Sequence, residues 1–313
     1  MSTSISTLVL DIAAKESIRA ARTALAPLGL FAHSFAEAAS EVGDTIKVPV
    51  FSRKAAAEFG ATITDGGQSV TNNYTGALEA GVAGKSIALN KHPWCSRRLL
   101  PDDDMETDAG RDWASQTTIC AVESVAKYMA EEVIVGIMKN ASVTALSPSG
   151  ATAIAKVASI RKAVIAGGVN PADATLLLPA TEYTDLISEL PYNTIGAQNA
   201  LVDGYVDRFL GFARVAEIHD GYTYTNSNSK LVTLNYLVVP NDGVGIATRL
   251  PKVINPDLYE VSTLSVPELG PWSFQIRSTG ANAVDAKFLG AEVIFGYQLF
   301  EPTKIFMKAT TAS

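Results

Sequence analysis

The strongest element of the sequence is residues 105–140, METDAGRDWASQTTICAVESVAKYMAEEVIVGIMKN. Its apolar side chains recur at steps of three and four residues, the spacing of one face of a helix. Glu123 and Lys127 are placed to form a favourable pair on the opposite side. We therefore predict a long amphipathic spine helix, which could reach about 45 Å at 1.5 Å per residue. The residues that carry this pattern are Ile119, Val122, Ala126, Met129, Val133 and Ile137.

An acidic run precedes this predicted helix. Asp103 is placed to act as the N-cap, and Glu106 follows three residues later, as in a capping box. The helix dipole favours carboxylates at a helix start by about 0.3–1 kcal/mol each. Asp102, Asp103 and Asp104 together could instead hold a Mg²⁺ ion. We predict the capping role and keep the metal site as the alternative.

A strand and a long hairpin are predicted upstream of the spine. In residues 43–51, Ile46, Val48 and Val50 alternate with polar residues, and Pro49 suggests an edge strand. Residues 60–86 are rich in glycine, with Asp65-Gly66 as a turn signal, and alternation resumes in residues 86–91. Such a hairpin has little apolar surface and is not stable alone. We expect it to lie across a neighbouring subunit.

The N-terminal segment is predicted to be an arm. Residues 1–42 are rich in alanine and serine, and the pattern from Asp11 to Ala26 allows a helix. That helix should end near Pro27 and Gly29. Because the segment has little apolar content for a core of its own, we expect it to pack on something else.

A mixed helix-and-strand region follows the spine. Helices are predicted at residues 150–166, ended by Gly167-Gly168, and at 181–190, on either side of the apolar strand Thr175–Leu178. Strands are then predicted at residues 208–218, 231–239, 244–248 and 293–307. The chain is therefore predicted to be α+β.

Composition limits the classes of function. The 313 residues are 47% hydrophobic but only 18% charged, which suits a surface that becomes covered on assembly. The net charge of −7 argues against a dedicated nucleic-acid binder. Two cysteines give no disulfide framework and favour a reducing compartment. Neither a signal peptide nor a run of about 18 apolar residues is found.

Motifs that carry catalysis or bind cofactors are weak throughout. Gly81–Ser86 departs from a phosphate loop, which requires a glycine at position 79 and a following helix. Asp242–Ala247 lacks the helix of a dinucleotide site and is predicted to be a turn. His92 and Cys95 are spaced like half of a zinc site, but no second pair exists. We therefore predict no catalytic, cofactor-binding or metal-binding residues. A metal-dependent hydrolase using His92 and Asp102–Asp104 is the distant alternative.

Charge is distributed unevenly between the hairpin region and the spine. Residues 53–98 contain six basic and three acidic residues, whereas residues 99–140 contain three basic and nine acidic residues. The two charges, +3 and −6, could belong to two separately solvated faces. They could also place the hairpin region of one subunit against the spine of the next, where complementary charge would set the register.

The order of these elements resembles that of tailed-bacteriophage major capsid proteins, with the Hong Kong ninety-seven-type capsid fold. The likeness rests on several motifs in succession. These are GDTIKVPV (43–50) as the strand into the extended loop, SIALNK (86–91) as its return, TLLLP (175–179), GFARV (211–215) and the closing strand GYQLFEP (296–302).

The resemblance implies an α+β capsid fold with an extended hairpin, a spine helix flanked by peripheral β-strands, and a separate helix-and-sheet axial domain. We divide the chain into an arm (1–42), the strand and extended loop (43–100), the spine (101–140), the axial domain (141–250) and a returning β-segment (251–313). The predicted assembly contacts join the hairpin region to the acidic run. They are Arg53, Lys54, Lys85, Arg97 and Arg98 against Asp102, Asp103, Asp104 and Glu106.

The resemblance also implies function and partners. Subunits would form hexamers and pentamers that close into an icosahedral virion capsid around double-stranded DNA, assembled in the host cytoplasm without a membrane. Because the first predicted strand begins near Gly43, we expect a separate scaffolding protein in place of a cleaved N-terminal segment. A portal is expected, and a decoration protein is left open. The alternative within this fold is an encapsulin-type nanocompartment shell protein, which encloses an enzyme cargo.

Overall fold

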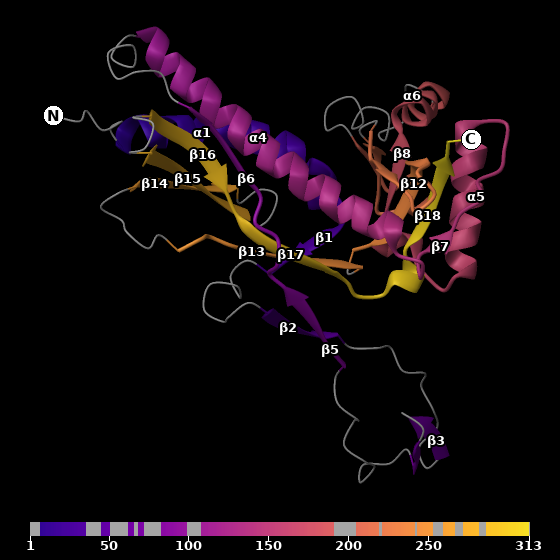
Figure 1. Ribbon diagram of the computed structural model, residues 1–313. Coiled ribbons are helices and arrows are strands. Elements are labelled where there is room, and N and C mark those ends of the chain that lie inside the picture. Colours follow the sequence, from indigo (N-terminus) through magenta and orange to yellow (C-terminus); the bar gives the residue numbers. More distant parts are fainter. Residues whose placement is uncertain are drawn as a thin grey trace.

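The computed structural model of the chain describes residues 7–35, 45–50, 62–65, 68–71, 83–98, 108–190, 205–218, 221–241, 243–252, 259–266, 272–281 and 286–312. One long helix crosses the body of the molecule, a helix-and-sheet unit lies at one end of it, and a narrow projection extends away from it (Figure 1). The combination of helices and several sheets is the α+β architecture that the sequence predicts.

The long helix α4 (Asp108–Lys139) is the predicted spine. Its inner face is fully buried, and Lys127 Nζ lies 2.6 Å from the Glu123 carboxylate on its outer face, as predicted. The predicted N-cap Asp103 and the first helical residues, 105–107, lie outside the described residues. The most buried side chains of α4 are Val122, Val125, Ala126, Met129, Val133, Ile134 and Ile137.

Helix α1 (Thr7–Phe31) packs along α4. The helix continues through Pro27 and Gly29, near which it was predicted to end, and reaches Phe31. A proline within a helix removes one backbone hydrogen bond, but Leu25, Leu28 and Phe31 are all buried on the same side. The apolar contact of this last turn offsets the lost hydrogen bond, and the segment packs on the spine of its own chain.

A four-stranded antiparallel sheet covers the spine, in the order β14-β15-β16-β6. Its inward-facing side chains join the core that α1 and α4 form. They include Trp272, Phe274, Ile276 and Leu289, none more than 1% exposed. The strands are β14 (Tyr259–Val266), β15 (Trp272–Ala281), β16 (Ala286–Glu292) and β6 (Trp94–Arg98).

A three-stranded sheet links this core to the projection. Strand β13 (Val244–Arg249) lies between β1 (Ala32–Ser34), which runs parallel to it, and β17 (Ile294–Leu299), which runs antiparallel. The projection begins with β2 (Thr45–Val50) paired to β5 (Ala83–Ala88). As predicted, β2 is an edge strand, with Ile46 and Val48 buried and alternating with exposed residues.

The outer part of the projection contains the predicted hairpin. Strand β3 (Thr62–Asp65) pairs antiparallel with β4 (Gln68–Thr71), and Asp65 is opposite Gln68. The two strands are separated by two residues, in agreement with the Asp65-Gly66 turn signal. Strand β3 lies at the far end of the projection from α4 (Figure 1).

The helix-and-sheet unit at the end of the spine is called the axial unit below. Its seven-stranded sheet runs β7-β18-β12-β8-β10-β9, with β11 paired to β12. Helices α5 (Ala153–Ala166) and α6 (Ala180–Glu189) lie close to their predicted positions and pack on the sheet. The strands are β7 (Thr144–Ala145), β8 (Ala174–Pro179), β9 (Tyr205–Asp207), β10 (Arg214–Ile218), β11 (Thr223–Thr225), β12 (Leu231–Pro240) and β18 (Phe306–Thr311).

Two of the predicted strands are interrupted. The segment 208–218 contains only β10, because residues Phe209–Gly211 form a short 3₁₀ turn, η2. The segment 293–307 is divided by a second 3₁₀ turn, η4 (Pro302–Lys304), which has proline at its start. The chain therefore leaves β17 and enters the axial unit as β18. A segment that looks like one strand in the sequence thus serves two sheets.

Helix α5 is held at both ends. Thr152 caps its start by accepting a hydrogen bond from the Ala155 N–H, and Gly167 closes its end. The Glu189 carboxylate, from the end of α6, accepts hydrogen bonds from the N–H groups of Ala153 and Ile154 at 3.0 and 2.9 Å. Lys156 and Glu182 form a second link between the two helices. No helix in the described part of the chain has the length and apolar character needed to cross a membrane.

Candidate assembly surface

The described residues include three of the nine predicted assembly contacts. Lys85 lies in β5, where it is half-buried and opposite Val48, while Arg97 and Arg98 lie in β6. Arg97 is exposed to solvent. The other six, which include all four acids, lie outside the described residues: Arg53, Lys54, Asp102, Asp103, Asp104 and Glu106. The predicted contact between the hairpin region of one subunit and the acidic run of the next thus stays a prediction.

The base of the hairpin is bound to the spine of the same chain. Lys91 Nζ lies 2.6 Å from the Glu132 carboxylate of α4, and this hydrogen bond raises the pKa of Lys91 above its usual value. The backbone of Lys91 also exchanges both hydrogen bonds with Phe295 of β17, at 2.8 and 3.0 Å. One pair between the basic hairpin region and the acidic spine is therefore intramolecular. The region of β2, β5 and residues 89–93 is called the hairpin base below.

Backbone close approach fixes the position of the hairpin base. Strand β5 crosses β17 at Gly296, where a Cβ atom would collide with the Ala88 carbonyl oxygen and lie 2.7 Å from the Ala88 carbonyl carbon. Ile46, Val48, Ile87 and Leu89 bury their side chains in a small cluster with Ala247 and Phe300. The hairpin base therefore has only a small core of its own, and its position depends on glycine.

A buried carboxylate lies next to the hairpin base. Glu292 of β16 is 1% exposed, and the His92 ring donates a hydrogen bond from Nε2 to its Oε2 at 3.0 Å. Arg277 Nη2 lies 3.1 Å from Glu292 Oε1 and donates a 3.3 Å hydrogen bond to Oε2. His92 is thus engaged with a carboxylate that the sequence analysis did not identify. No pattern could have found it, since the three residues are far apart in the sequence.

Aromatic side chains are exposed around the same region. Trp94 at the start of β6 is 60% exposed, and Tyr128 on α4 is 43% exposed. The Tyr128 ring packs edge-on against Phe295, with ring centroids 6.4 Å apart. Burial, assisted by the Glu132 carboxylate, raises the pKa of Tyr297 in β17. Large exposed aromatic residues are typical of protein-protein contacts.

The weak motifs of the sequence occupy ordinary structural positions. Residues 83–88 are strand β5, so no helix follows Gly84 as a phosphate loop requires. At the dinucleotide-like segment, the Gly243 N–H donates a 2.8 Å hydrogen bond to the Pro240 carbonyl, and residues 244–247, which were predicted to belong to a turn, lie in strand β13. Within the described ranges, no group of three or more His, Cys, Asp and Glu side chains could hold a metal ion.

Comparisons with known proteins identify the fold. No protein-family model and no curated protein matches the chain. Among solved structures, the chain is similar to the capsid of Ralstonia phage GP4, with 8% identity and a TM-score of 0.52 over 90% of this chain and 87% of that chain. The capsid of an empty GTA particle gives 12% identity and a TM-score of 0.52, covering 91% of this chain and 90% of the other.

A third similar structure is also a capsid. The capsid of a native GTA particle gives 11% identity and a TM-score of 0.50, with 91% of this chain and 90% of that chain covered. At 8–12% identity these likenesses show the fold. The fold of this chain is therefore a capsid fold. In particular, it is the tailed-phage capsid-type fold that the order of elements in the sequence predicted.

Proposed function

We propose that this protein is the major capsid protein of a tailed bacteriophage. Its subunits would form hexamers and pentamers and build an icosahedral head around double-stranded DNA. The observation that carries the proposal is the capsid-type fold, which extends over nine tenths of the chain. The role is structural and involves no catalysis.

The projection supports this proposal. Its outer hairpin, β3 and β4, is two-stranded, and an isolated two-stranded hairpin is marginal in water. The hairpin base has only a small apolar cluster, in contrast to the continuous core beneath the spine. A projection of this kind is stabilised when it lies on the surface of a neighbouring subunit.

We propose that complementary charge sets the register of that contact. Arg53, Lys54, Lys85, Arg97 and Arg98 of one subunit would face Asp102, Asp103, Asp104 and Glu106 of the next. Reversing the charge of Arg53 and Lys54 should impair assembly and change its dependence on salt, because exposed charges are screened by ions. Unchanged assembly with an unchanged dependence on salt would exclude this pairing.

The partners and location follow from the same proposal. A separate scaffolding protein and a portal would take part in assembly in the host cytoplasm, with the virion capsid as the final location. The acidic balance, −7 overall, suits a shell that encloses DNA without binding it tightly. A decoration protein on the outer surface is compatible with this arrangement.

Electron microscopy of the purified, recombinantly expressed chain tests the proposal. Closed shells or rings of five or six subunits are the expected result, and coexpressed scaffolding protein should shift rings toward shells. Nuclease-protected DNA inside particles from infected cells would support the phage head, whereas an enzyme cargo would identify a nanocompartment. A chain that remains monomeric at every concentration and binds metal would overturn the proposal.

A further inference from the structure

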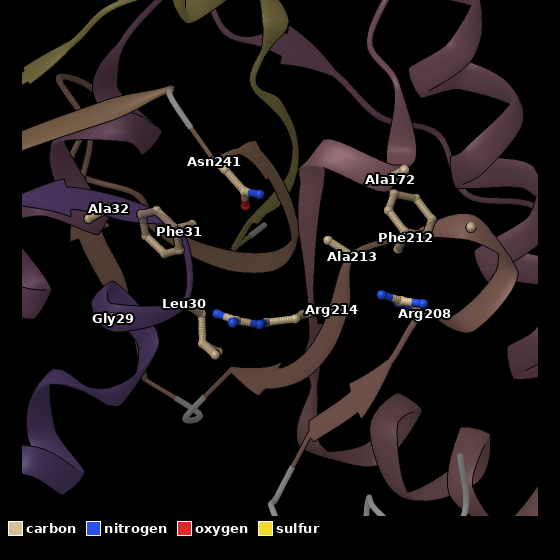
Figure 2. A pocket seen from close by; sticks show the side chains of 11 residues that line it. Gly29, Leu30, Phe31, Ala32, Ala172, Arg208, Phe212, Ala213, Arg214 and Asn241 are labelled. Atoms are coloured by element: carbon tan, nitrogen blue, oxygen red, sulfur yellow. The ribbon is translucent and has the colours of Figure 1, made fainter. Parts of the chain in front are cut away.

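A pocket of about 750 Å³ lies between the end of α1 and the axial unit. Pockets that bind small molecules have volumes of about 300–1,000 Å³. Leu30 and Phe31 of α1 form an apolar side of this pocket, and Figure 2 shows Arg208 and Arg214 on the axial side. The function proposed above gives the pocket no role, so its occupant is inferred from its lining.

The charged part of the lining consists of two arginines from one hairpin of the axial unit. Asp207, which precedes Arg208, is opposite Arg214 in the ladder of β9 and β10. The Arg208 N–H also donates a 3.2 Å hydrogen bond to the carbonyl of Ala213. No acidic side chain that the structure describes lines the pocket. Two like charges on adjoining positions repel each other, and a bound anion would offset this repulsion.

The two arginines are available to a ligand in different ways. Arg208 is exposed to solvent. Arg214 already takes part in another interaction, but a guanidinium group has five N–H donors, so it can bind an anion as well. In Figure 2 the Arg214 side chain extends from β10 toward Leu30. The ligand would therefore lie between the axial unit and the end of α1.

The backbone that carries Arg208 adopts a conformation that is rare for residues other than glycine. Arg208 has φ 54° and Leu210 has φ 46°, both in the left-handed region. Such residues cluster at functional sites and persist only where the surrounding structure holds them. Here Phe212 is completely buried and donates a 3.0 Å hydrogen bond to the Phe209 carbonyl, which closes the turn. The turn thus fixes the start of the Arg208 side chain before any ligand binds.

Hydrogen bonds also fix the sides of the pocket relative to each other. Thr175 Oγ1 in β8 donates a 3.1 Å hydrogen bond to the Leu30 carbonyl, which joins α1 to the axial unit. Asn241, another lining residue, donates a 2.8 Å hydrogen bond from its N–H to the Asp173 carbonyl. A site formed in advance in this way loses little conformational entropy when a ligand binds.

We propose that this pocket binds a small organic phosphate of about the size of a nucleotide. Its phosphate would lie on Arg208 and Arg214, and its organic body against Leu30 and Phe31. A phosphate monoester carries a charge of about −1.5 to −2 at neutral pH, which matches two arginines, whereas a carboxylate carries a single charge. The guanidinium group also donates parallel hydrogen bonds to phosphate oxygens. Inorganic phosphate alone would leave the apolar side unoccupied.

Two features favour a small ligand over a nucleic-acid strand. The described lining contains two cations, whereas tight binding along a phosphate backbone requires a row of them. The chain as a whole carries −7, so long-range electrostatics oppose the approach of a polyanion. A ligand with few charges meets less of this opposition.

Isothermal titration calorimetry of the full-length chain, at fixed ionic strength and with EDTA present, tests the site. ATP is the organic phosphate probe, and inorganic pyrophosphate is the probe without an organic body. We expect saturable binding of both, with ATP binding more tightly. The R208Q/R214Q variant should bind both at least about tenfold more weakly, because charge-assisted hydrogen bonds are lost. The matched control K230Q, which removes an exposed cation between β11 and β12, should bind like the wild type.

Leu30→Ala tests the organic part of the ligand separately. The affinity for ATP should fall at least about threefold while that for pyrophosphate stays unchanged, because only the organic body contacts the apolar side. Arg208→Gln alone is a second charge variant that leaves the other interaction of Arg214 intact, and it should also weaken both probes. Thermal unfolding without ligand would show that each variant is folded.

The inference would be overturned if neither probe bound at millimolar concentration, or if Arg208→Gln bound both as tightly as the wild type. Citrate that bound more tightly than ATP would identify a carboxylate site instead. A short single-stranded oligonucleotide that bound more tightly than ATP, and was lost in R208Q/R214Q, would identify nucleic acid as the occupant. Either result would also overturn the inference. Shell formation, which electron microscopy tests, is independent of all these outcomes.

Discussion

In the axial unit, a seven-stranded sheet is covered by two helices, of which α5 is capped at both ends, whereas at the hairpin base β5 lies directly on β17 with little side-chain core between them. The axial unit is therefore stabilised by apolar packing spread over many residues. The hairpin base depends on a few positions: one glycine, one buried carboxylate and one half-buried ion pair. This difference implies that single substitutions should have larger effects at the hairpin base.

The largest effect is expected at Gly296. Valine there would place Cβ against the Ala88 carbonyl group, which is backbone and cannot move aside without separating β5 from β17. We expect Gly296→Val to lower the free energy of unfolding by about 3 kcal/mol or more, at the upper end of overpacking effects. Chemical denaturation of the purified chain measures the loss.

Gly136 in α4 is the matched control for that substitution. A Cβ atom there would meet the hydroxyl end of Tyr297, which is a side chain and can rotate away. Alanine also favours the helix by about 1 kcal/mol over glycine. Gly136→Ala should therefore cost clearly less than Gly296→Val, and equal losses would show that backbone contact does not control the hairpin base.

The next largest effect is expected at Glu292. Replacing this buried carboxylate by alanine removes the partner of Arg277 and of His92 at once. Breaking a buried ion pair is costly, but Arg277 is still 23% exposed, so water can solvate part of its charge. We therefore expect Glu292→Ala to lower the free energy of unfolding by about 2–3 kcal/mol.

His92→Ala separates the contributions within this cluster. The His92 side chain is 50% exposed, so its loss should cost at most about 1 kcal/mol. Thermal or chemical unfolding of both variants provides the comparison. A larger loss for His92→Ala than for Glu292→Ala would mean that the histidine, and not the arginine, balances the buried charge.

A smaller effect is expected in the axial unit, at the cap of α5. Glu189→Ala removes the two hydrogen bonds to the N–H groups of Ala153 and Ile154, and should cost about 1–2 kcal/mol. Asp185→Ala, four residues earlier on the exposed side of α6, should change stability by no more than about 0.5 kcal/mol. If both variants were equally stable, the cap would contribute nothing beyond the solvation of the helix start.

Periodic features were predictable from the sequence, and contacts between distant segments were not. The spacing of apolar residues predicted α4, and alternation predicted β2 and the second half of β5, because both patterns depend only on which side of the element is buried. The strand β5 covers residues 83–88, three residues earlier than the predicted 86–91. The extension of α1 through Pro27 depends on the partner that buries Leu28 and Phe31, which the sequence does not show.

The same limit applies to the candidate site. The sequence left open whether the basic hairpin region of one subunit meets the acidic spine of the next. Lys91 with Glu132 joins these two regions within a single chain, and neither residue is among the predicted contacts. The cluster around Glu292 joins residues up to 200 positions apart and therefore leaves no local pattern. The predicted intersubunit pairing still requires the charge-reversal test.

The smallest effect at neutral pH, and a distinct effect in alkali, is expected at Tyr183. Its hydroxyl is buried and, among the described residues, has no hydrogen-bond partner. Burial, assisted by Glu217, raises its pKa from 10.0 to about 12. Tyr183→Phe removes an unsatisfied polar atom, so at pH 7 it should change stability by no more than about 0.5 kcal/mol.

Above pH 10 the unfolded chain releases the Tyr183 proton while the folded chain retains it, so this residue lowers stability as the pH rises through the window from 10 to about 12. Burial also raises the pKa values of Tyr222 and Tyr236 to about 12, so these residues add to the same loss of stability with rising pH. The melting temperature of Tyr183→Phe should therefore fall less steeply than that of the wild type across this window. Parallel curves would mean that the phenol ionises in the folded chain without cost, in which case the α6 side of the axial unit is more open to solvent than its packing indicates.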